Sequence, residues 1–244
     1  MRLDPHVLYE TKRGEYGPVV PVVLDGGVFA WLVLGYAELL EVTRREYVFS
    51  RDSRHWRPRE GSIPKDWPLE PHTVWRPNAV FAGGEEHARL RGALTRALGR
   101  VSPQQVRRFT SETGHRLIDA FCASGRADLV QQYAGPLPLM TLMRLFGFPA
   151  APEAQLQMAI PALLECGDQA READRQIMQI VADHVARRHE EPAADITSWL
   201  IQDEEAGLDD NEICEQIWLT LNAGQGATSI WIANIAEQMV STRM

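Results

Sequence analysis

The chain has 244 residues, with 45% apolar and 24% charged side chains, so it can bury the core of an ordinary globular protein. Its formal net charge of −8 argues against a nucleic-acid partner, because affinity for phosphates comes from clustered lysine and arginine. The most apolar run, 28–34, is far short of the roughly 20 residues that cross a membrane, and residues 1–5 show no apolar core of a signal peptide. With three cysteines, too few for a disulfide framework, the composition predicts a cytoplasmic protein without a membrane partner.

The first fifty residues predict short elements. Helical spacing is found over residues 5–16 and again over 36–47. Between them, two β-branched runs on either side of the glycine-rich turn 25–27 predict a β-hairpin. We therefore expect a hairpin and the first helices over residues 17–50.

Residues 53–77 predict a long loop. Five prolines interrupt this segment and remove helix donors, and three tryptophans, Trp56, Trp67 and Trp75, lie between them. A loop of this length is usually either functional or disordered. The tryptophans favour an ordered loop that packs on another part of the molecule.

The rest of the chain, residues 85–244, is predicted to be helical. The predicted helices cover residues 85–98, 103–125, 129–146, 153–165, 170–189, 195–201 and 209–240. Ser102 before a proline is a helix-start pattern, and Pro136 and Pro138 are expected to kink or split the third helix. The fold class is therefore mainly α with a small amino-terminal β-hairpin, and we expect a single incomplete domain over residues 1–244.

The last predicted helix is unusual because it is apolar on nearly every face between residues 217 and 236. Asp209 and Glu212 form a capping-box pattern at its start. A helix that is apolar all round is buried inside a large protein. The chain ends about one turn after this helix, so we expect no further segment of these 244 residues to cover it.

His87 and Arg91 form the first pattern with a chemical meaning. They are spaced i and i+4, so both project from one face of a helix. Such a pair suits two carboxylates or a phosphate. A solvated helix face beside Glu85 and Glu86 is the alternative, and spacing alone favours that alternative.

The second pattern is the segment 223–228, with the sequence AGQGAT, in the middle of the last helix. Each of its two glycines costs about 1 kcal/mol relative to alanine in a helix. A helix tolerates this cost where another group approaches its backbone or where it opens locally. Close packing of two helices explains the glycines equally well.

A metal site is not predicted. His184 and His189 are five residues apart and therefore about 140° apart around a helix, so they do not share a ligand face.

Taken in order, these segments resemble the soluble actinobacterial cytochromes P450 over essentially all 244 residues. The hairpin and the long loop precede the helix with Phe-x-x-Gly-Glu-Glu-His-x-x-x-Arg at 81–91, the block at 127–149, and the segment from Asp203 into the long helix. The opening through Trp31 is most similar to the P450s of actinobacterial conservon operons. The resemblance implies the amino-terminal portion of the P450 fold, ending in its long central helix.

The resemblance also implies a function. It identifies the chain as the front portion of a haem-thiolate monooxygenase, which binds haem b, takes electrons from a ferredoxin-type donor and inserts oxygen into a small organic substrate. His87 and Arg91 match the family's pair that contacts the haem propionates. Ala223 and Gly224 match the small residues that let the long helix pass over the haem. The loop 53–77 matches the segment that roofs the substrate pocket.

Two departures from the family pattern stand out. Gly226 and Ala227 occupy the positions of an acid and a threonine that take part in proton delivery, and neither side chain can relay a proton. Thr228 matches the last position of that motif and is a weak catalytic candidate, rotated about 100° from its neighbour. The cysteine loop that supplies the iron ligand has no match before Met244, so we expect these 244 residues alone to be inactive.

The alternative is a haem-free, catalytically inactive P450-like interaction or scaffold protein. Gly226 and Ala227 would then be signs of lost catalysis, and a partner would have to cover the apolar last helix. A small-ligand-binding helical domain that uses the tryptophan-rich loop is a third and weaker interpretation.

Overall fold

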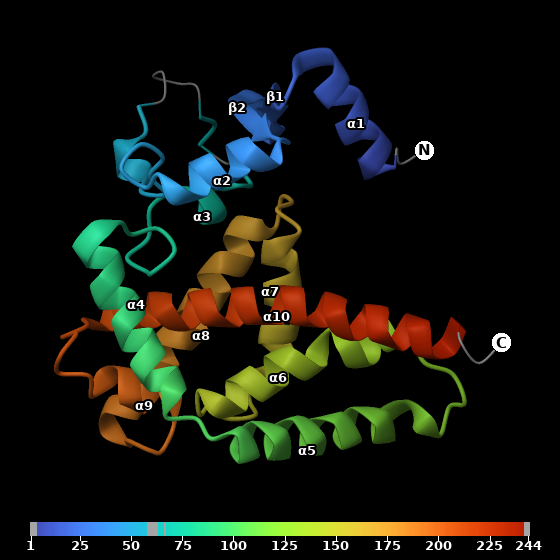
Figure 1. The fold of residues 1–244 in the computed structure, drawn as a ribbon. Helices are drawn as coiled ribbons and strands as arrows, with labels where there is room; N and C mark the ends of the chain where they lie inside the picture. Colours follow the sequence, from blue (N-terminus) through green and yellow to red (C-terminus); the bar gives the residue numbers. More distant parts are fainter. Residues whose placement is uncertain (1–3, 58–62, 66, 242–244) are drawn as a thin grey trace. The chain divides into compact units, whose positions relative to one another are not determined.

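The computed structural model describes residues 4–57, 63–65 and 67–241, which fall into two compact units, Met1–Trp75 and Arg76–Met244. The units are described separately below, and their helices and strands are labelled in Figure 1. Helices predominate, and one antiparallel two-stranded sheet accompanies them, as the sequence predicts. None of the helices described is long and apolar enough to cross a membrane. The expectation of a single domain stays a prediction.

The first unit begins with the helix and hairpin that the sequence predicts. Helix α1 covers Pro5–Tyr16. Strands β1 (Val19–Leu24) and β2 (Val28–Val33) pair in antiparallel register around the short turn Asp25–Gly27. Helix α2 covers Tyr36–Arg44 and ends three residues before the predicted boundary at residue 47.

The predicted loop 53–77 contains more regular structure than expected. A short helical turn covers Ser53–His55, and helix α3 covers Glu70–Thr73. The first forms because the Asp52 carboxylate accepts the backbone N–H of Arg54 at 2.9 Å. Pro71 is compatible with α3 because it lies in the first turn, where no helical donor is needed. Residues 58–62 and 66 of the predicted loop, including the predicted break at Pro58, lie outside the described residues.

Trp67 anchors this loop to the hairpin turn. Its side chain is buried, and its indole N–H donates to the backbone oxygen of Asp25 at 2.7 Å. The turn leaves space for the ring because Gly26 has no side chain, and a Cβ there would lie 3.0 Å from both Trp67 and Pro64. Gly26 also adopts a φ of +81°, which favours glycine. The expectation that a tryptophan packs this loop is confirmed for Trp67.

The second unit consists of helices that pack around one long helix. Its helices are α4 (Gly84–Gly99), α5 (Pro103–Cys122), α6 (Pro136–Leu145), α7 (Glu153–Leu164), α8 (Ala170–Glu190), α9 (Ile196–Ile201) and α10 (Asp210–Ser241). Helix α10 contacts α4, α6, α7, α8 and α9, as Figure 1 shows for the red helix. The predicted helix 129–146 is split, as expected, into a π-helical turn, Val130–Ala134, and α6.

Both predicted helix starts are confirmed. The Ser102 hydroxyl accepts the backbone N–H of Gln105 at 3.1 Å. At the start of α10, the Asp209 carboxylate accepts the N–H of Glu212 at 2.7 Å, and the Glu212 carboxylate accepts the N–H of Asp209 at 3.1 Å. These two bonds complete the capping box.

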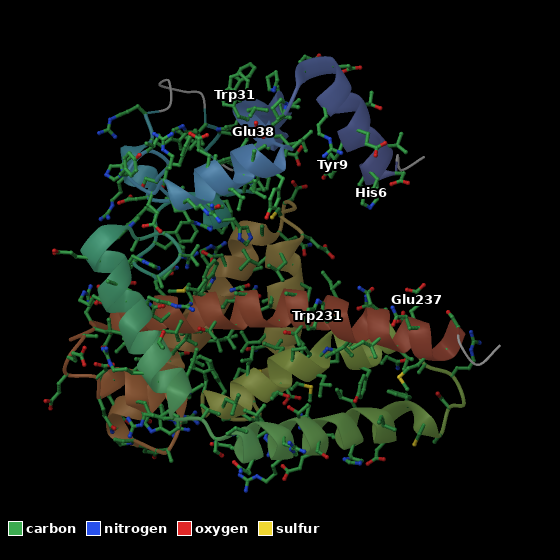
Figure 2. All side chains as sticks on the ribbon, viewed as in Figure 1. His6, Tyr9, Trp31, Glu38, Trp231 and Glu237 are labelled. Carbon is green, nitrogen blue, oxygen red and sulfur yellow. The ribbon has the colours of Figure 1, made fainter. Side chains whose placement is uncertain are left out.

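Helix α10 changes from buried to exposed along its length. Ile217 and Leu221 are fully buried, whereas the exposed fractions of Ile230, Trp231 and Ile235 are 62%, 75% and 55%. Trp231 lies on the second half of the helix in Figure 2. The first turns of α10 are therefore buried, and the described helices leave its later turns uncovered. This agrees with the expectation that no further segment of these 244 residues covers the apolar helix.

Candidate functional site

Helix α4 separates its cationic side chains onto two flanks. At about 100° per residue, His87 and Arg91 lie on one side of the buried face, and Arg89 and Arg96 lie on the other. The buried face itself consists of Leu90, Ala93, Leu94 and Ala97.

One flank is neutralised by acids that come from far along the chain. Arg89 forms a two-pronged ion pair with Glu212, one arm of which measures 3.1 Å. Arg96 binds both oxygens of Asp203, at 2.8 and 2.9 Å, and Glu205 at 2.9 Å. Hydrogen bonds from these two guanidinium groups lower the pKa of Glu212 and of Asp203. This flank therefore ties α4 to the turn before α10 and to the first turn of α10.

The other flank is not neutralised. Arg91 is exposed and His87 is half-buried. Neither has a side-chain hydrogen bond, an ion pair or a ring contact with any residue in the part of the chain that the structure describes. The two side chains are therefore available to bind an anion with two carboxylates or a phosphate.

Helix α10 presents a face of small side chains at the middle of its length. Ala223, Ala227 and Thr228 are exposed there. The low bulk of this face leaves room for a flat group to approach the helix. The hydroxyl of Thr228 is the one side-chain hydroxyl in the segment 223–228.

Gly224 faces in a different direction from this exposed face. A Cβ at Gly224 would lie 2.7 Å from Cδ1 of Leu142 on α6, closer than real side chains approach. Of the two explanations that the sequence leaves open, close packing of two helices therefore applies to Gly224. Gly226 has more room, because a Cβ there would lie 3.6 Å from Cδ1 of Leu164.

The two glycines of α10 give a stability test. Alanine is favoured over glycine inside a helix, so we expect Gly226→Ala to raise the free energy of unfolding by about 0.5–1 kcal/mol. We expect no gain from Gly224→Ala, because its methyl group would overlap the Leu142 side chain. Urea denaturation followed by circular dichroism measures both changes.

Leu142→Ala provides the matched background. With the leucine removed, Gly224→Ala should show the same gain as Gly226→Ala, and the two substitutions at 142 and 224 should be coupled. Equal gains for the two glycines in the presence of Leu142 would contradict the packing role of Gly224.

Gln225 is a buried polar residue whose role the sequence did not reveal. Its side-chain amide donates to the backbone oxygen of Gly135 at 3.4 Å, and the Ser229 hydroxyl reaches the same oxygen at 3.4 Å. The two bonds join α10 to the end of the π-helical turn. The sequence feature that could have indicated this role is a glutamine within a largely apolar helix.

The cysteines occupy three different environments. Cys122 is exposed at the end of α5. Cys166 has a φ of +52° in the turn after α7, between the predicted helices 153–165 and 170–189. Cys214 is buried in α10, and burial raises the pKa of its thiol to about 11. Cys214 therefore carries a protonated thiol at neutral pH.

His184 and His189 have separate structural partners. Nε2 of His184 lies 3.0 Å from the backbone oxygen of Phe146, and Nε2 of His189 lies 2.8 Å from Asp210. Burial lowers the pKa of His184. Within the described ranges, no group of three or more His, Cys, Asp or Glu side chains is arranged to hold a metal ion.

Comparison with curated proteins gives relatives with oxygenase names. The chain is 30% identical over 256 residues to the mycinamicin IV hydroxylase/epoxidase of Micromonospora griseorubida, covering 98% of this chain and 60% of the relative. It is 29% identical over 238 residues to the 2-hydroxy-5-methyl-1-naphthoate 7-hydroxylase of Streptomyces carzinostaticus, covering 91% of this chain and 57% of the relative. No family model matches the chain.

Solved structures give the same result. The mixed-function P450 MycG in complex with mycinamicin IV aligns with a TM-score of 0.69 and 25% identity, over 96% of this chain and 58% of its own. A P450 from Streptomyces coelicolor aligns with a TM-score of 0.72 and 24% identity, over 91% of this chain and 57% of its own. The chain thus spans less than two thirds of the length of the proteins that it matches.

The fold is therefore the amino-terminal portion of the cytochrome P450 fold, from its hairpin to the long helix α10. In sequence and fold the chain is similar to bacterial cytochromes P450, as the order of its motifs predicts. The closer likeness to conservon-associated members stays a prediction.

Haem b is the cofactor that this family implies, and the residues of this chain fit part of it. The unpaired His87 and Arg91 fit the two haem carboxylates, and the exposed small side chains of Ala223 and Ala227 fit the approach of a flat ring. Cys214 does not fit the role of the iron ligand, because it is buried among the packed residues of the first turns of α10.

Proposed function

We propose that these 244 residues form the front part of a haem-thiolate monooxygenase that inserts oxygen into a small organic substrate. The observation that carries this proposal is the asymmetry of α4, whose Arg89 and Arg96 are ion-paired while His87 and Arg91 remain available for an anion. The hydroxylase names of the relatives support the same reaction class.

The candidate residues on α4 and α10 have different roles in holding the haem. His87 and Arg91 hold the haem carboxylates through charge-assisted hydrogen bonds. Ala223 leaves space for the haem beside α10, and Gly224 keeps α10 close to α6. When bound, haem b supplies the iron centre for oxygen chemistry. We also propose that the haem iron has a thiolate ligand and that a ferredoxin-type protein donates the electrons. The proposed location of the protein is the cytoplasm.

Proton transfer differs from the family pattern in this proposal. Gly226 and Ala227 carry no group that holds a proton. The exposed hydroxyl of Thr228 is the one protein hydroxyl of the segment 223–228. We therefore infer that water or a hydroxyl group of the substrate moves the proton, with Thr228 as its nearest candidate partner in this segment.

The carboxylate-binding role is tested with two forms of the same probe. We expect the chain to bind haemin about tenfold more tightly than haemin dimethyl ester, because esterification removes the two negative charges that His87 and Arg91 would meet. In the double variant His87→Ala, Arg91→Ala this preference should fall close to one. Absorbance titration of the haem band measures both dissociation constants.

The ester controls for haem that adheres to the exposed apolar residues of α10, since both probes present the same ring. Arg107→Ala on α5 is the matched variant, because Arg107 is also an exposed arginine. A wild-type chain that does not distinguish the acid from the ester contradicts the assignment of His87 and Arg91.

The alternative, a haem-free scaffold protein, is not favoured by relatives that are hydroxylases. The DNA that follows the codon for Met244 separates the two functions. A downstream segment encoding a cysteine loop is expected for the monooxygenase, and its absence in every frame would defeat that proposal.

A further inference from the structure

We propose that Arg89 is a positioning residue, which acts through Glu212 to set the direction in which α4 presents His87 and Arg91. This inference rests on the proposed function, because it concerns the side chains assigned there to the haem carboxylates. Arg89 itself points to the opposite flank of α4 and does not contact that group.

The carboxylate that receives Arg89 is held in a fixed place. Glu212 accepts the backbone N–H of Asp209 and is itself one arm of the capping box of α10. Its side chain is only 12% exposed. Arg89 also donates to the backbone oxygen of Ala206 at 3.1 Å. The guanidinium group therefore meets two acceptors that cannot swing freely, in the fork geometry that favours a single orientation.

A second ion pair, which ties α4 in the same way, lies two turns further along the same flank. Arg96 follows Arg89 by seven residues, so the two side chains project within about 20° of each other. Its partner Asp203 is also held by backbone, since its carboxylate accepts the N–H of Ala206 at 3.0 Å. Two ties on one flank prevent α4 from rotating about its own axis.

The approach to α4 is tied to the same helix. The side-chain amide of Asn78 donates to Glu215 at 3.2 Å, one turn after Glu212 on α10. The Asn78 side-chain oxygen accepts the backbone N–H of Val80 at 3.0 Å, which fixes the segment before α4. The first turns of α10 therefore hold both the segment before α4 and Arg89 within α4.

Arg89 is the tie closest to the candidate anion site. It lies between His87 and Arg91 in the sequence, so a rotation of α4 at residue 89 moves both side chains together. A change in their direction weakens a two-point contact with a pair of carboxylates more than it weakens contact with an uncharged ring.

The test compares variants by their preference for haemin over haemin dimethyl ester. We expect Arg89→Gln to lower this preference about threefold, the size of effect that a partly exposed ion pair supports. Arg89→Lys keeps the positive charge but loses the forked guanidinium group, so its preference should lie between those of the wild-type chain and of Arg89→Gln. Arg107→Gln should keep the wild-type preference. A merely structural role would weaken the binding of both probes equally and leave their ratio unchanged.

Glu212→Gln approaches the same contact from the other side. Glutamine retains the capping-box acceptor, so α10 should start normally while the charge that holds Arg89 is removed. This variant should lower the ratio as Arg89→Gln does, and it replaces Arg89→Gln if that chain does not fold in a urea titration. A wild-type ratio in a folded Arg89→Gln or Glu212→Gln chain overturns the positioning role alone. A wild-type chain without any preference overturns the proposed function, and the positioning role with it.

Discussion

Gly147→Ala is expected to lower the free energy of unfolding by about 3 kcal/mol or more. Gly147 has a φ of +78°, a conformation that favours glycine. A Cβ there would lie 2.6 Å from Cγ of Asp195 and 2.7 Å from a guanidinium nitrogen of Arg188. The methyl group would therefore collide with both members of an ion pair.

The surroundings of Gly147 offer no easy way to relax. Arg188 and Asp195 are paired at 2.8 Å, and both side chains are largely buried. The neighbouring oxygen of Phe146 accepts hydrogen bonds from Thr197 at 2.8 Å. Moving either charged side chain breaks a buried ion pair, and moving the backbone breaks these hydrogen bonds.

Gly207→Ala is the matched control. Gly207 also has a positive φ, of +53°, but a Cβ there would meet nothing within 4 Å. It should therefore lose only the conformational preference of glycine, about 1 kcal/mol. Urea denaturation followed by tryptophan fluorescence gives both values. Equal losses at residues 147 and 207 would show that the ion pair does not resist the methyl group.

Arg76→Met is expected to lower the free energy of unfolding by about 3 kcal/mol. The side chain of Arg76 is 11% exposed, and its nitrogens bind Glu215 and Asp174 at 2.7 Å each. Its guanidinium carbon lies 4.0 Å from the ring centroid of Trp218. Methionine keeps most of the stacking volume but leaves two carboxylates without their cation, one of them deeply buried.

Arg175→Met on α8 is the control for this prediction. Arg175 pairs with Glu172, but both side chains are well exposed, so its loss should be below about 0.5 kcal/mol. Adding Glu215→Gln to Arg76→Met should recover part of the lost stability, since it removes one uncompensated charge. If Arg76→Met and Arg175→Met lose the same stability, the network around Arg76 does not contribute as a buried ion pair.

The sequence determined the features that depend on near neighbours. It gave the bounds of α1 and of the hairpin, because proline, glycine and β-branched residues act on their own backbone. The capping box of Asp209 and Glu212 could be predicted because both partners lie within one turn. The i, i+4 spacing of His87 and Arg91 likewise placed the candidate anion site on one flank of a helix. The order of these local motifs was sufficient to predict the family.

Only the tertiary structure decided which charged side chains are ion-paired and which helices pack closely. Arg76 and Glu215 are 139 residues apart, and Arg89 and Glu212 are 123 residues apart, so no local pattern pairs them. The pattern around Gly224 allowed two explanations, and only the position of Leu142 showed that this glycine lies at a close contact between two helices. The point along α10 where burial ends, between Leu221 and Ile230, likewise depends on which helices pack against it. Local propensity acts through the backbone of a few residues, whereas ion pairing, close packing and burial depend on which segments meet in space.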